Sequence, residues 1–215
     1  MSAGWVSARV RGASVLLLTG GALMAALWLI FTTVHGPTSF NEDNPFLGGS
    51  MFFWGMLLGG IPNLLIAAGL ISVAAPLSLA TGRMARAGFI LLLIGLVVPA
   101  VIDLAIRALG APLLLPLAAA GALLLATGNL SNPRVSRPSR LLVLLIGVLL
   151  TTAFAFPLLP MTLTDPLGGF RIYGALAHLG VGIGWALFGL TVLRAPRAGQ
   201  SSRPDPDRSV TGHGD

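Results

Sequence analysis

The sequence contains no cysteine and few charged residues, and each shortage excludes a class of protein. Without cysteine there is no disulfide, no thiol nucleophile, no iron–sulfur cluster and no cysteine-ligated zinc. Charged residues make up 9% of the 215 residues, whereas an average soluble domain has about 25%. Because 55% of the residues are hydrophobic and the mean hydropathy is +0.89, we expect most of the surface to face lipid.

Lysine is missing too, because all 13 basic residues are arginine. This bias predicts a GC-rich bacterial source. The formal net charge is +6, which in a soluble protein would suggest a nucleic-acid partner. The arginines lie instead in short connections between apolar runs, and no basic face carries interleaved aromatic residues. We therefore expect a lipid bilayer, and no nucleic acid, as the partner.

Sequence signatures of enzymes are also missing. There is no His-Glu-x-x-His, no phosphate-binding loop, no dinucleotide fingerprint and no Gly-x-Ser-x-Gly. No predicted helix carries two histidines one turn apart, and no acidic cluster stands where it could hold magnesium. We therefore predict a non-enzymatic protein without cofactor or bound metal, and no motif identifies a known family.

Apolar runs long enough to cross a bilayer recur along the chain and predict an all-α integral membrane protein. The first run follows Arg9 and Arg11 as in a signal peptide, but it is too long and lacks an Ala-x-Ala cleavage site, so we expect it to remain. We predict a short segment 1–12, one transmembrane domain 13–193 and a disordered polar tail 194–215. The six predicted helices are about 13–34, 49–79, 87–109, 111–128, 141–159 and 169–193.

The arginines also predict the orientation of these helices. With six helices and a cytoplasmic N-terminus, only Arg107 and Arg171 fall outside, and the other 11 of the 13 arginines fall inside. Basic residues in short loops favour the cytoplasmic side. We therefore predict a multi-pass protein of the bacterial cytoplasmic (inner) membrane with both termini in the cytoplasm.

A weak internal repeat relates two parts of the chain. Shifted by 120 residues, 47–76 and 167–196 share eight identical pairs, among them Gly60/Gly180 and Gly69/Gly189. A duplication would produce this pattern. A composition rich in leucine, glycine and alanine is the alternative explanation.

Asn63 is the first candidate binding residue, because a polar group in hydrocarbon must find a partner. It follows Pro62, which would free the carbonyl of Leu58 in the middle of a helix. Its neighbours one turn away are Gly59 and Ala67, both small. Two interpretations follow: a ligand or ion site in a kinked helix, or a close helix contact in which the Asn63 amide bonds to a neighbouring helix.

His178 and Asp103 are the other two candidates within the membrane. His178 has Gly174 and Gly182 one turn away, so we expect it to face protein and to act as a proton relay, a haem or metal ligand, or a structural group. Asp103 and Arg107 are spaced four apart, which favours a surface ion pair. If Asp103 points inward, it becomes a proton-coupling candidate instead.

The outer loops offer a further candidate site. Glu42, Asp43 and Asp165 could together bind a cation, or they could cap helices and form turns. The two loops are 35–49 and 160–174. Each combines Asn-Pro or Asp-Pro with Gly-Gly, a composition typical of turns.

Two kinds of function are compatible with these features. One is a permeation unit for small solutes or ions, which predicts Asn63 and His178 in a common cavity between the helices 49–79 and 169–193. The other is an accessory subunit that packs against a membrane partner or a second copy through glycine-rich helix faces. The alternative is a membrane-embedded enzyme or a haem- or metal-binding protein that uses His178 with a carboxylate in hydrogen-bond reach.

Overall fold

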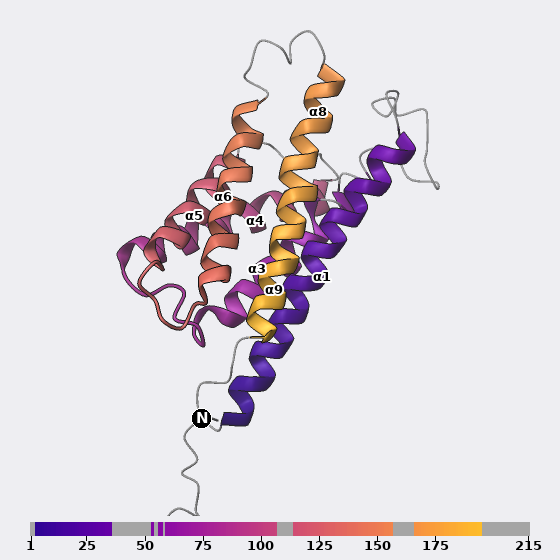
Figure 1. Ribbon diagram of the computed structural model, residues 1–215. Helices are drawn as coiled ribbons and strands as arrows, with labels where there is room; N and C mark the ends of the chain where they lie inside the picture. Colours follow the sequence, from indigo (N-terminus) through magenta and orange to yellow (C-terminus); the bar gives the residue numbers. More distant parts are fainter. Residues whose placement is uncertain are drawn as a thin grey trace, which may run out of the picture.

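All secondary structure in the described part of the chain is helical, with no strand, so the predicted all-α class is confirmed (Figure 1). The helices lie side by side as a bundle. The computed structural model describes residues 3–35, 53, 56–57, 59–106, 114–156 and 166–194.

Six helices make up the bundle, and the last of them is built from three consecutive segments. The segments α8 and α9 are α-helical, and η3 between them is a π-helix. The elements are α1 (Ala3–His35), α3 (Ile61–Ala74), α4 (Arg83–Ile106), α5 (Leu115–Gly128), α6 (Arg137–Ala155), α8 (Pro166–Gly174), η3 (Ala175–Gly180) and α9 (Val181–Arg194).

Four of the helices are long and apolar enough to cross a membrane, which gives the chain the character of a membrane protein. They contain the spans Ala8–Ile30, Arg83–Ala105, Arg137–Ala155 and Arg171–Arg194. The helices α3 and α5 are apolar but have 14 residues each, or roughly 21 Å of helix.

Helix α1 begins at Ala3, ten residues earlier than predicted, and two further helix boundaries differ for reasons of local chemistry. Helix α3 ends at Ala74 and not near residue 79, because Pro76 has no N–H to continue the helical hydrogen bonds and Ser78 then has a positive φ of 52°. Helix α6 begins at Arg137, four residues earlier than predicted. There the Ser136 side chain accepts a hydrogen bond from the Ser139 N–H at 3.2 Å and caps the helix.

Helix α1 lies between α3 and α9. Two adjacent glycines of α1 allow its close contacts with these two helices. A Cβ added to Gly20 would lie 2.9 Å from Ile66 of α3. A Cβ added to Gly21 would overlap the backbone of Ala186 and Gly182 of α9. Successive residues point about 100° apart around a helix, so one Gly-Gly step serves two neighbours.

One glycine pair that the 120-residue shift aligns, Gly69/Gly189, also meets on α1. A Cβ on Gly69 of α3 would lie 2.7 Å from the Leu17 side chain, and one on Gly189 of α9 would lie 2.9 Å from the Leu18 backbone N. The two aligned helices therefore use the same position to contact neighbouring residues of α1.

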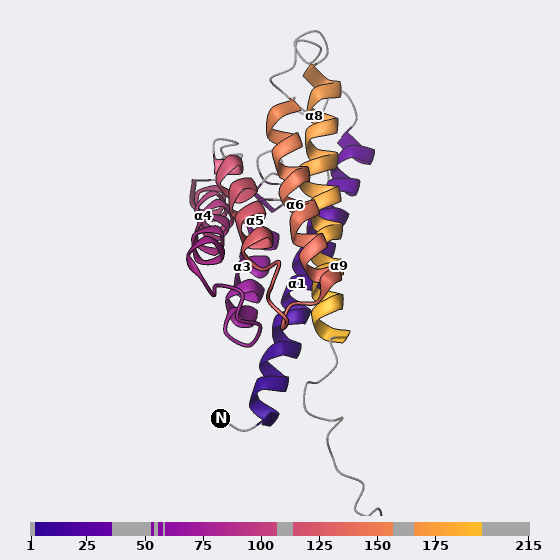
Figure 2. The ribbon, with the colours of Figure 1, turned by 60° about the vertical axis from the view of Figure 1, so that its left-hand side comes forward.

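Helices α4 and α5 form a close antiparallel pair. Each carries two glycines seven residues apart, Gly88 and Gly95 on α4 and Gly121 and Gly128 on α5. A Cβ on Gly88 would lie 2.8 Å from the Gly121 carbonyl oxygen, and one on Gly95 would lie 2.7 Å from the Cβ of Ala118. Small residues let membrane helices approach this closely. Figure 2 shows this pair on one side of the molecule and α1, α6 and α9 on the other.

The starts of α1, α4 and α6 and the end of α9 lie at one end of the bundle, here called the arginine end. Arginines mark each of these positions: Arg9, Arg83, Arg137 and Arg194. Within this end the Ser139 hydroxyl of α6 bonds the Thr191 hydroxyl of α9 at 2.7 Å. The polar groups at this end therefore connect helices that are far apart in the sequence.

A buried asparagine joins two loops at the arginine end. Asn129 is 3% exposed, and its amide donates to the carbonyl oxygens of Leu79 and Leu125, both at 2.8 Å. Its own side-chain oxygen accepts from the Asn132 amide at 2.7 Å. Because the donors and the acceptor of Asn129 are all used, this residue is structural.

Candidate functional site

The Pro62–Asn63 step lies in the first turn of α3, directly after a bend at Gly60, which follows the helical residue Gly59. The Gly60 N–H donates to the Met56 carbonyl at 2.7 Å, and the Gly60 carbonyl accepts from the Leu64 N–H at 3.1 Å. Helical hydrogen bonds therefore continue on both sides of Pro62, which itself has no N–H to donate. This arrangement agrees with a helix that bends beside Pro62. The start of that helix near residue 49 lies outside the described residues and stays a prediction.

The Asn63 side chain bonds within its own chain segment. Its Nδ2 donates to the carbonyl oxygen of Gly59 at 2.7 Å, and the side chain is half-buried. The amide therefore supports the bend at Gly60. Its donor is not directed across to a neighbouring helix.

Asp103 is the only acidic residue in the described ranges, and it points inward from α4. It is 2% exposed, and its Oδ1 is buried without a hydrogen-bond partner. Its Oδ2 lies against Gly59, where an added Cβ would overlap it. Arg107 lies outside the described residues, and burial of the carboxyl group contradicts the prediction of an ion pair at the surface.

Gly59 is the point where the two polar side chains meet. Its carbonyl accepts the Asn63 amide, and its α-carbon faces the carboxyl group of Asp103. The absence of a side chain at Gly59 lets the carboxyl group approach the backbone of the preceding helical turn. Only glycine leaves room for this contact between residue 59 and α4.

His178 lies in the π-helical segment η3 and faces α1, as its small neighbours in the sequence predict. Its ring stacks on Trp28 of α1 with 5.5 Å between ring centroids and an interplanar angle of 20°. Its Nδ1 is buried without a hydrogen-bond partner. Gly174 lies so close to the Trp28 ring that a Cβ there would overlap it. π-Helical turns within α-helices occur frequently at functional sites.

Tyr173 lies beside His178 in the last helix. Its ring meets His178 edge to face, with 6.1 Å between centroids and an interplanar angle of 79°. Asp103 of α4 and the Tyr173–His178 pair are here together called the polar cluster. Sequence reasoning singled out Asp103 and His178 but missed Tyr173.

Asn63 and His178 are not brought together. Asn63 lies on α3 and His178 in η3, and α1 lies between α3 and the last helix. The groove described below contains neither residue. The described residues give His178 no hydrogen bond to a carboxylate.

The described residues contain no group of three or more metal-ligating side chains. The outer-loop candidates Glu42, Asp43 and Asp165 lie outside the described residues. Inside the bundle, the described side chains that can exchange a proton are those of the polar cluster.

No protein-family model matches the sequence, and no curated protein and no solved structure matches it either. No relative therefore assigns a role to the polar cluster.

Proposed function

We propose that the protein is a non-enzymatic ion-permeation unit of the membrane that moves protons through the polar cluster. The observation that carries this proposal is Asp103, a buried carboxyl group with an unpartnered oxygen inside an apolar helix. Ionisable groups within a membrane are expensive, and they typically mark ion pathways and proton relays.

The geometry favours protons over larger solutes. Asp103, Tyr173 and His178 can each accept and release a proton, and the Tyr173 and His178 rings are in contact. A proton moves along such groups without an open passage of its own size. A solute pathway between Asn63 and His178 would instead have to pass α1.

A flux measurement in vesicles tests this proposal. The full chain is reconstituted into liposomes that contain a pH-sensitive dye, and a potassium diffusion potential drives protons inward. The wild-type protein is expected to acidify the interior, and Asp103→Asn is expected to reduce the rate to that of protein-free liposomes.

Thr127→Val is the matched control for this measurement. Thr127 is exposed on α5, and its hydroxyl bonds the carbonyl of Leu123 in its own helix at 2.8 Å. The control should keep the wild-type rate. A wild-type rate no greater than that of empty liposomes, or an unchanged rate in Asp103→Asn, would contradict the proposal.

We further propose that all six helices cross the bacterial cytoplasmic membrane, with both termini and the arginine end in the cytoplasm. The placement of the arginines supports this orientation. Because the chain has no cysteine, single cysteines report topology directly. In intact cells a membrane-impermeant maleimide should label Ser39→Cys and should reach Ser131→Cys only after permeabilisation. The reverse pattern would overturn the orientation.

A second candidate function is that of an accessory subunit in a membrane complex, and an exposed face of α1 favours it. This face carries Ala8, Gly12, Thr19, Ala22 and Ala26 at helical spacing, with the exposed Val15 between Gly12 and Thr19. Small residues one turn apart allow another helix to pack closely. The flux measurement separates the two candidates, because an accessory subunit alone would conduct no protons.

A further inference from the structure

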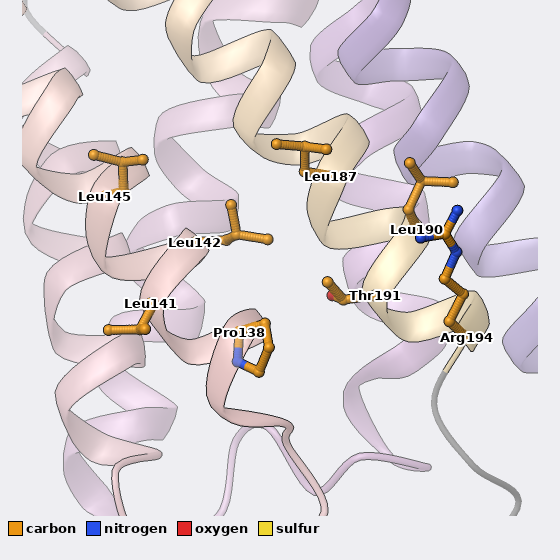
Figure 3. A pocket seen from close by; sticks show the side chains of 8 residues that line it. All are labelled: Pro138, Leu141, Leu142, Leu145, Leu187, Leu190, Thr191 and Arg194. Atoms are coloured by element: carbon orange, nitrogen blue, oxygen red, sulfur yellow. The ribbon is translucent and has the colours of Figure 1, made fainter.

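A groove lies between α6 and α9 on the outside of the bundle, away from the polar cluster (Figure 3). Its volume is about 380 Å³, and its walls are mostly leucine. Among them Leu141 and Leu145 are about half exposed, at 55% and 49%. The lining residues are Pro138, Leu141, Leu142, Leu145, Leu187, Leu190, Thr191 and Arg194.

The groove has one polar group available for a ligand. The Thr191 hydroxyl is already engaged, with the Ser139 hydroxyl at 2.7 Å and the Phe188 carbonyl at 2.8 Å. Arg194 is exposed at the end of α9. Its side chain turns back along the helix, and the guanidinium lies beside Leu190, one of the lining residues (Figure 3).

The surroundings of Arg194 favour an anionic occupant. Arg137 and Arg140 lie at the adjoining start of α6, whose helix dipole also favours negative charge. Among the residues that the structure describes, the only carboxylate, Asp103, is near the other end of α4. The arginine end therefore has an excess of positive charge that no described acidic side chain offsets.

We propose that this groove binds an anionic phospholipid, with one acyl chain along the leucines and the phosphate paired with Arg194. The apolar walls fit a hydrocarbon chain and offer it no unsatisfied polar group. A guanidinium binds a phosphate through two parallel hydrogen bonds. A zwitterionic headgroup adds a cation that the neighbouring arginines repel, so a headgroup of net negative charge is preferred. Basic sites between membrane helices on the cytoplasmic side recognise anionic headgroups in this way.

Lipid retention by the purified full-length protein tests the proposal. Native mass spectrometry in detergent is used to compare binding of added phosphatidylglycerol and phosphatidylcholine of identical chains. The wild-type protein should prefer phosphatidylglycerol. Arg194→Gln should reduce this preference about fivefold, the equivalent of one arginine–headgroup attraction. Leu187→Trp, which fills the groove, should reduce retention of both lipids.

Arg86→Gln is the matched control, because Arg86 is also exposed at the arginine end but lies on α4, outside the groove. It should keep the wild-type preference. An equal loss in Arg86→Gln would show a general effect of surface charge and would overturn the proposal. Equal retention of the two lipids by the wild-type protein, or unchanged retention in Leu187→Trp, would overturn it as well.

Discussion

Replacing Gly21 with leucine is expected to destabilise the bundle more than any other single substitution in α1. A Cβ at this position would overlap the backbone of Gly182 and Ala186 in α9, and backbone cannot rotate away as a side chain can. Extra methylene groups in a packed core cost about 1–3 kcal/mol even where neighbours adjust. For Gly21→Leu we expect a loss above about 3 kcal/mol, because α9 itself would have to move.

Gly12→Leu provides the control in the same helix. A Cβ at Gly12 meets nothing within 4 Å, so the substitution should be neutral or stabilise the helix by up to about 1 kcal/mol. Thermal unfolding in detergent, with size-exclusion chromatography of each variant, measures the difference. Equal unfolding midpoints for the two variants would show that α1 and α9 are not in the contact described.

The number of helices and their all-α class were predictable because each apolar run carries its own signal, independent of the others. The glycine-rich faces were visible in the sequence too. Which helix each face contacts was not, because helix pairing depends on residues far apart in the chain. The adjacent Gly20 and Gly21 illustrate the limit, since nothing local indicates that one faces α3 and the other α9.

The role of Asn63 was not predictable for a physical reason. Pro62 indicates an interruption of the helical hydrogen bonds, but hydropathy does not show what the adjacent amide contacts. The bend lies at Gly60, and the Asn63 amide bonds the Gly59 carbonyl on the other side of it. The feature that most resembled a binding site in the sequence therefore supports a bend in its own chain segment.

The polar cluster was predictable only in part. His178 and Asp103 stood out because both are titratable groups in apolar runs. The inward direction of Asp103 was not evident, because Arg107 four residues later is an equally good local partner. Tyr173 gave no signal, since an aromatic residue near a helix end is ordinary in a membrane protein. The π-helical segment around His178 likewise has no sequence signature.

Replacing Asp103 with leucine is expected to stabilise the protein while it abolishes proton flux. Aspartate and leucine branch at the same carbon, and the larger methyl groups of leucine fill the space around Oδ1 while they press on Gly59. It removes a buried carboxyl group whose Oδ1 has no partner, and relief of such a group is worth about 1–3 kcal/mol. The thermal unfolding midpoint in detergent should therefore rise.

Asn129→Leu is the matched comparison, and it should lower the thermal unfolding midpoint. Asn129 is similarly buried and has the same branching, but its amide and oxygen are fully hydrogen-bonded. Leucine there would leave the Leu79 carbonyl and the Asn132 amide without their partner, at a cost of about 1–3 kcal/mol. A residue that lowers stability and is required for activity is retained for function. If Asp103→Leu instead unfolds at a lower temperature, as Asn129→Leu should, the carboxyl group is structural and the proton proposal loses its basis.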